Sequence, residues 1–344
     1  MEEDSLAFGA VRVADLEGMG TLAFGPVPSR RLGRSLGINN IPAKTCSYSC
    51  VYCQVGRTTN VTIERRALYR PEDIFSEARR KVGEAASRNE VIDYLTFVPD
   101  GEPTLDINLS KEIVLLKQMG IPVAVLTNSS LLWRDDVRED LLEADLISLK
   151  VDAVSEGLWR RVNRPPRNLR LDTVLEGVTK FLEQFRGVII SETMLIDGID
   201  YEGEFEKIPD FLGDAKRLGK AYVAVPIRPP AERWVKPAGE ETVNKAFQIL
   251  SKRLGFNKVE FLIGYEGNAF AFAGKLEEDL LSIAAVHPMR KEAVKEFLKR
   301  ANANWQTIEK LLREGKLVEL EYEGNTYYMR KLPDRTETIN ARYR

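Results

Sequence analysis

Hydrophobic positions follow two alternating patterns from about residue 37 to about residue 265. Short apolar runs rich in Val, Ile and Leu alternate with longer amphipathic stretches. The runs are typical of strands buried on both faces, and the stretches are typical of helices that cover a sheet. We predict strands at residues 36–41, 91–98, 123–127, 146–151, 188–195, 221–227 and 259–263. We predict helices at residues 71–87, 110–119, 171–185, 204–218 and 241–254.

This alternation predicts an α/β fold with a parallel sheet, in which a helix follows each strand. No glycine-rich turn of the dinucleotide-binding type opens the series, which favours a full or partial parallel (βα) barrel. In such a barrel, functional side chains are expected at the carboxyl ends of the strands.

The pattern changes after about residue 285. Residues 292–299 and 305–313 are predicted to form two short helices, and residues 316–322 and 326–331 a β-hairpin. This order is typical of a small α+β winged-helix-like domain. The predicted organisation is an N-terminal extension (1–24), a barrel (25–265), a connector (266–284), the winged-helix-like domain (285–333) and a C-terminal tail (334–344).

The composition is that of an ordinary globular protein. Of 344 residues, 44% are hydrophobic and 30% are charged, with 50 basic and 52 acidic side chains. This balance excludes a disordered chain and a polybasic nucleic-acid-binding protein. No apolar run approaches the roughly 20 residues of a membrane helix, and the acidic start is unlike a secretory signal. We therefore expect a cytoplasmic protein with no membrane contact.

The three cysteines carry the most specific information. Cys46, Cys50 and Cys53 form a C-x3-C-x2-C motif directly after the first predicted strand. Their odd number and close spacing exclude a disulfide scaffold. Three thiolates can bind three irons of a cubane cluster and leave the fourth iron open. Structural zinc needs four protein ligands, and the single histidine, His287, lies far downstream, so a cluster is favoured over zinc.

With this motif the chain resembles the radical S-adenosylmethionine (SAM) superfamily, over about residues 25–265. The resemblance implies one [4Fe-4S] cluster whose open iron binds the amino and carboxylate groups of SAM. Reduction then cleaves SAM into methionine and a 5′-deoxyadenosyl radical, which abstracts a substrate hydrogen. It also implies a reductant such as ferredoxin or flavodoxin.

The resemblance also implies cofactor-binding residues. Tyr52 matches the aromatic residue near the adenine. The segment at residues 99–105 resembles the Gly-Gly-Glu-Pro motif that meets the SAM amino group, although Asp100 stands where a glycine is common. The predicted set, with polar residues at later strand ends, is Tyr52, Gly101, Glu102, Pro103, Asn128, Lys150, Asp152, Ser191 and Glu192. Two alternatives remain open: Asn128 as a turn former, and Lys150 paired with Asp152.

Residues 24–34 and 226–230 resemble the tRNA wyosine-synthesis branch of this superfamily, the 4-demethylwyosine synthase-like enzymes. That branch has further upstream cysteines for a second cluster, and this chain has none, so its reaction is not carried over. Arginine binds phosphate or carboxylate with two parallel hydrogen bonds. We predict substrate contacts from Arg30, Arg31, Arg34 and Arg228.

With all three thiols committed to one cluster, no cysteine is left to bind an auxiliary cluster. This disfavours sulfur insertion, which consumes a second cluster, and methylation through methyl-cysteine, which needs a free thiol as nucleophile. The leading hypothesis is a radical SAM enzyme that acts on RNA, first of all tRNA, through the winged-helix-like domain. A net charge of −2 does not itself favour nucleic acid. The alternatives are an activase that generates a radical on a partner protein, and an iron–sulfur winged-helix regulator that needs no SAM site.

Overall fold

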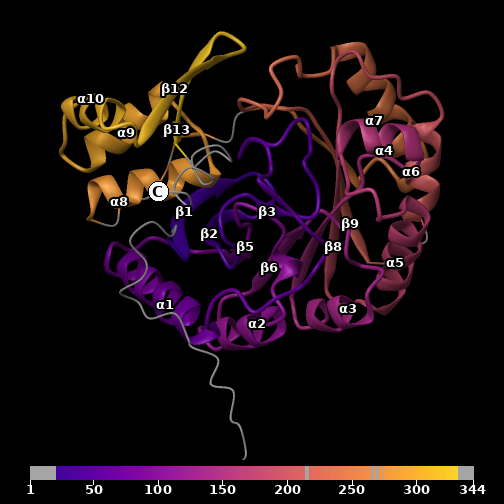
Figure 1. Cartoon of the computed structure of the whole chain (residues 1–344), viewed down its shortest axis with the longest axis horizontal. Coiled ribbons are helices and arrows are strands. Elements are labelled where there is room, and N and C mark those ends of the chain that lie inside the picture. The colour runs from indigo at the N-terminus through magenta and orange to yellow at the C-terminus, as the bar shows by residue number, and fades with distance from the viewer. Residues whose placement is uncertain are drawn as a thin grey trace, which may run out of the picture.

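The computed structural model describes residues 21–213, 217–264, 267–268, 270, 272 and 274–331. The predicted C-terminal tail and most of the N-terminal extension lie outside these residues. A sheet curled into a half-barrel forms the centre of the molecule, with helices around its outer face (Figure 1).

The sheet has eight strands in the order β1-β2-β5-β6-β7-β8-β9-β10. They are β1 (Ala23–Ser29), β2 (Gly33–Ile38), β5 (Tyr94–Phe97), β6 (Val123–Thr127), β7 (Leu146–Lys150), β8 (Val188–Met194), β9 (Leu218–Ala224) and β10 (Val259–Leu262). Strand β1 is antiparallel to β2, and all other neighbours are parallel. The predicted partial (βα) barrel is therefore confirmed.

Seven helices within the described part of the barrel cover its outer face (Figure 1). They are α1 (Pro71–Ser87), α2 (Leu109–Lys117), α3 (Asp135–Leu141), α4 (Glu156–Val162), α5 (Leu171–Gln184), α6 (Glu204–Gly213) and α7 (Glu240–Leu254). Helix α1 shows why such stretches are helical. Pro71 occupies the first turn, where no backbone donor is needed, and Glu72 and Asp73 face the positive end of the helix dipole.

Some predicted boundaries are wrong. The helix predicted at residues 204–218 is described as far as Gly213, and Leu218 already begins β9, so the strand predicted at 221–227 lies earlier. In the sequence, Ala215 and Leu218 continue the helical spacing of Ile208 and Leu212, so the period alone does not mark the border between helix and strand. Short elements escaped prediction: β1, α3, α4, the bridge of β3 (Thr45–Cys46) with β4 (Asn60–Val61), and the 3₁₀ turn η2 (Pro103–Leu105).

The C-terminal part forms a second, small α+β unit. Its elements are α8 (Leu276–Val286), β11 (Met289–Arg290), α9 (Lys291–Arg300), α10 (Gln306–Arg313), β12 (Leu317–Tyr322) and β13 (Asn325–Arg330), with sheet order β11-β13-β12. Helix α8 occupies part of the stretch that the sequence predicts as a connector. Phe24 and Val27 of β1 share a core with Phe297, Ile308 and Tyr328, so the unit packs against β1 (Figure 1).

Within the described residues, no helix has the length and apolar character needed to cross a membrane.

Candidate active site

A pocket of about 280 Å³ lies at the carboxyl ends of the central strands. All three cysteines line it. The other predicted site residues that line it are Arg30, Arg31, Tyr52, Gly101, Glu102, Asn128, Lys150, Glu192 and Arg228. Residues from β6, β7 and β8 and from the segments after β5 and β9 thus meet at one edge, as a parallel barrel requires.

The cysteine loop runs along this pocket and is held by backbone bonds to the end of α4. The N–H of Ser49 donates to the carbonyl of Asn163 (3.1 Å), and the N–H of Val51 donates to that of Val162 (2.9 Å). Burial, followed by the charge of Asp152, raises the pKa of Cys50 to about 12. Buried thiolates are therefore unfavourable unless cationic iron compensates them.

The chemistry of this donor set fits a cubane cluster. All three cysteines are free and partly buried. Among the described side chains, no three Cys, His, Asp or Glu residues converge on one point suited to a single metal ion. A cubane does not require such convergence, because each thiolate binds a different iron.

Glu102 lies between the cysteine loop and the end of β6. Its carboxylate accepts hydrogen bonds from Thr104 Oγ1 (2.6 Å), Thr127 Oγ1 (2.6 Å) and the N–H of Asn128 (2.8 Å). Burial raises the pKa of Glu102, and the bonds from Thr104, Thr127 and Asn128 oppose this shift. The N–H of Glu102 donates to Thr45 O (3.2 Å), which braces the turn against the start of the cysteine loop.

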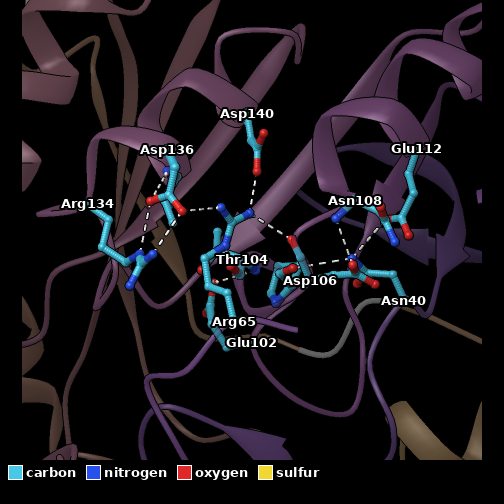
Figure 2. A network of polar contacts seen from close by, with 12 residues as sticks. Asn40, Arg65, Glu102, Thr104, Asp106, Asn108, Glu112, Arg134, Asp136 and Asp140 are labelled. Atoms are coloured by element: carbon cyan, nitrogen blue, oxygen red, sulfur yellow. Dashed lines mark hydrogen bonds and ion pairs between the residues drawn. The ribbon is translucent and has the colours of Figure 1, made fainter. Parts of the chain in front are cut away.

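A buried arginine, Arg65, supports this turn (Figure 2). Arg65 donates to the carbonyls of Thr104 (2.9 Å) and Asp106 (2.7 Å). It also pairs with Asp136 and Asp140 of α3. The sequence analysis did not identify Arg65, because its partners lie far along the chain.

Three charged side chains meet deeper in the pocket. Lys150 and Arg31 both form ion pairs with Glu192. Burial alone would raise the pKa of Glu192, but Lys150 and Arg31 outweigh burial and lower it to about 2. The Lys150 ammonium lies 4.8 Å from the centre of the Tyr52 ring, in cation–π contact. Lys150 therefore pairs with Glu192, and no described ion pair joins it to Asp152.

Four predicted site residues do not line the pocket. Pro103 is buried, and its carbonyl accepts from Asn40 Nδ2 (3.3 Å). Ser191 is buried on the opposite face of β8 from Glu192, because successive side chains alternate.

Asp152 lies behind Tyr52 and accepts its hydroxyl hydrogen. Arg34 lies near the amino end of β2 and pairs with Glu90 (3.5 Å).

The four arginines predicted to bind substrate come from different parts of the fold. Arg30 and Arg31 come from the turn between β1 and β2, and Arg31 reaches inward to Glu192. Arg228 follows β9 and donates from Nη1 to Gln54 Oε1 (2.9 Å), beside Cys53. The pocket thus brings Arg30, Arg31 and Arg228 together and leaves Arg34 outside.

Two asparagines contact the cysteine sulfurs. Asn128 Nδ2 lies 3.4 Å from Cys46 Sγ, so its amide faces the cysteine loop. Asn163 Nδ2 lies 3.5 Å from Cys50 Sγ. The sequence analysis missed Asn163, which follows a short helix and stands in no recognisable motif.

The sequence profile of the radical SAM superfamily matches residues 40–212, the segment that carries the cysteines, Glu102 and Glu192. This chain belongs to the radical SAM superfamily. As a member of this superfamily it is an enzyme whose cofactors are a [4Fe-4S] cluster and S-adenosylmethionine.

A relative named UPF0026 protein, from Methanocaldococcus jannaschii, is 51% identical over 321 residues, which cover 93% of this chain and 99% of the relative. Among solved structures, TYW1 with a lysine-pyruvate adduct is 16% identical, covers 64% of this chain and 73% of that chain, and has a TM-score of 0.46. A radical SAM methyltransferase from Sphaerobacter thermophilus is 15% identical, covers 67% and 66%, and has a TM-score of 0.49.

Proposed function

We propose that this enzyme abstracts hydrogen from an RNA substrate, with tRNA as the first candidate. In this proposal residues 285–333 form a winged-helix-like domain that holds the RNA. The observation that carries the proposal is a basic groove on the C-terminal unit, whose hairpin is bonded directly to the pocket wall.

The groove lies between α9 and the start of α10 and has a volume of about 880 Å³. Its lining residues are Lys295, Leu298, Lys299, Asn302, Ala303, Asn304, Trp305 and Thr307. Lys295 and Lys299 are exposed and form no ion pair with another residue that the structure describes. Two free ammonium groups, amide and hydroxyl donors and an indole ring suit a phosphodiester backbone and a stacked base.

The outer face of α10 is less suited to this role. Its Lys310 pairs with Glu277 of α8 (2.6 Å), and Glu309 lies on the same short helix. The charges available for phosphate therefore belong to the α9 side of the groove.

The C-terminal hairpin contacts the pocket wall. Tyr322 donates to the carbonyl of Pro226 (3.1 Å), and Tyr327 donates to that of Ile227 (2.8 Å). Both carbonyls belong to pocket-lining residues. An RNA bound to the C-terminal unit would thus be held by a unit that directly contacts the wall of the pocket.

Within the pocket, Cys46, Cys50 and Cys53 would hold the cluster, and Glu102 and Tyr52 would hold SAM. When bound and reduced with an electron from a ferredoxin or flavodoxin, these cofactors supply a 5′-deoxyadenosyl radical.

Arg30, Arg31 and Arg228 line the same pocket and would hold a phosphate of the substrate. The kinship with the wyosine-synthesis branch stays a prediction.

The test is anaerobic. The reconstituted, reduced protein is given SAM with or without bulk tRNA, and 5′-deoxyadenosine is measured by mass spectrometry. We expect tRNA to stimulate product formation, and the double variant Lys295→Glu/Lys299→Glu to lose the stimulation while its basal rate persists. The matched control is Lys310→Glu, whose ammonium is already paired.

If a partner protein stimulates product formation and tRNA does not, the enzyme acts on protein, as the activase hypothesis states. No 5′-deoxyadenosine under any condition, from a protein with four irons per chain, would favour the regulator.

A further inference from the structure

We infer that Asn163 and Asn128 set the reduction potential of the cluster by donating side-chain N–H groups to two of its three cysteine ligands. The sequence analysis assigns no role to Asn163, and it expects Asn128 to contact SAM. Both asparagines would then be positioning residues that act through sulfur.

The orientation of the Asn163 amide is fixed by its partners. Its Nδ2 lies 2.7 Å from Asp152 Oδ2 and 3.5 Å from Cys50 Sγ. Asp152 Oδ1 accepts from the N–H of Met194 (2.9 Å), and Tyr52 donates to Oδ2. A carboxylate only accepts, so the nitrogen of Asn163 must face it. Asp152 uses one N–H, which leaves the second for Cys50, with Tyr52 Oη also within reach at 3.3 Å.

The Asn128 amide is fixed in a similar way. Its Oδ1 accepts from the N–H of Ser130 (3.0 Å), which directs Nδ2 toward the cysteine loop. There Nδ2 lies 2.9 Å from Ser47 Oγ and 3.4 Å from Cys46 Sγ. Among the described residues, no side-chain amide donates to Cys53, so two of the three cysteine ligands accept an amide hydrogen bond and the third does not.

Hydrogen bonds to ligand sulfur withdraw electron density and stabilise the more negative, reduced cluster, which raises its potential. Asn163 has a second effect, because its amide stands between Cys50 and the Asp152 carboxylate. Removal of the amide would leave that carboxylate acting on the sulfur without the intervening donor. Loss of either asparagine should therefore make the cluster harder to reduce, with the larger effect at Asn163.

The experiment is a redox titration of the reconstituted full-length protein, followed by electron paramagnetic resonance. Asn163→Leu and Asn128→Leu keep the approximate side-chain volume and remove the donor. We expect both to have a lower midpoint potential than the wild type. The matched control is Trp159→Phe on α4, which removes a bond to Tyr48 Oη (3.0 Å) near Asn163 without touching sulfur. Its midpoint should equal that of the wild type.

Iron and sulfide are measured first. Wild-type midpoints in both asparagine variants with full clusters would overturn the inference. Loss of the cluster from Asn163→Leu but not from Trp159→Phe would also overturn it, because Asn163 would then build the site without tuning it. A second readout needs no variant: resonance Raman Fe–S bands of the wild type should shift in D₂O, and unchanged bands would contradict N–H···S bonding.

Discussion

Nε2 of His287 lies 2.7 Å from Nη2 of Arg228, and this contact joins the C-terminal unit to the wall of the pocket. A guanidinium group only donates, so the imidazole must accept at Nε2 and carry its own hydrogen at Nδ1. Burial, followed by the charge of Arg228, lowers the pKa of His287 well below its usual value. The histidine is therefore neutral in the folded enzyme.

This neutrality predicts a specific pH dependence of stability. In the unfolded chain His287 has a pKa of about 6.5, so below that pH the unfolded state binds a proton that the folded state does not. The free energy of unfolding should then fall by about 1.4 kcal/mol per pH unit as pH drops below about 6.5, until pH reaches the folded pKa. Urea unfolding at pH 7 and pH 5.5 measures this loss.

The control is His287→Gln, which keeps an acceptor for Arg228 and cannot titrate. Carboxyl groups contribute equally to the pH slopes of both proteins, so the difference between slopes reports His287 alone. Equal slopes would contradict the assignment. Because the chain has one histidine, its NMR titration provides an independent check.

A buried ion pair between Lys81 of α1 and Asp279 of α8 attaches the C-terminal unit to the barrel. Their charged atoms are 2.7 Å apart, and the side chains are 2% and 4% exposed. Lys81→Met removes the ammonium that neutralises the buried Asp279 carboxylate, which should cost about 3–5 kcal/mol of stability. The double variant Lys81→Met/Asp279→Leu should recover most of this in denaturant unfolding.

An exposed pair provides the comparison. Lys180 and Glu176 on α5 are 2.7 Å apart and more than half exposed, so Lys180→Met should change stability by less than about 1 kcal/mol. A loss from Lys81→Met no larger than this would show that the buried pair does not anchor α8.

The fold was predictable where local pattern and packing agree. Helix α1 and strand β6 have the predicted bounds, because Pro71 starts one and a continuous apolar run forms the other. Strand β1 was missed because Gly25, Pro26 and Pro28 interrupt any strand pattern.

The candidate site was predictable only in part. Cys46, Glu102 and Glu192 stand in a motif or at a strand end, so the sequence located them. Arg65 and Asn163 were not predictable, because their roles come from partners distant in sequence, as between Asn163 and Cys50. Chain proximity also misleads, since Ser191 adjoins Glu192 and faces away from the pocket.

Gly101 is predicted to be irreplaceable for cluster binding. A Cβ at this position would lie 1.7 Å from the carbonyl oxygen of Thr45, next to Cys46. Gly101→Ala must therefore displace the start of the cysteine loop, and we expect reconstituted iron to fall well below four per chain. Gly83→Ala is the control, because its Cβ meets nothing within 4 Å. Full iron content in Gly101→Ala would show that the loop adjusts without losing the cluster.

Glu102 is predicted to bind the amino group of SAM and not to hold the cluster. Its Oε1 accepts from Thr104 and Thr127, whereas Oε2 accepts only from the N–H of Asn128 among the described residues. Oε2 therefore keeps a lone pair for an ammonium group, in a charge-assisted bond.

Glu102→Ala should accordingly retain its iron but bind SAM about tenfold more weakly or worse, a loss of at least about 1.4 kcal/mol. Anaerobic equilibrium dialysis with labelled SAM measures the affinity, and iron analysis of the same sample measures the cluster. Thr127→Val is the control, because it removes a neutral donor from Oε1 and leaves Oε2 unchanged, so its affinity should fall less. If Glu102→Ala binds SAM as tightly as the wild type and has a full cluster, the SAM ammonium is held elsewhere in the pocket. Glu102 then serves only to brace the turn after β5 against the cysteine loop.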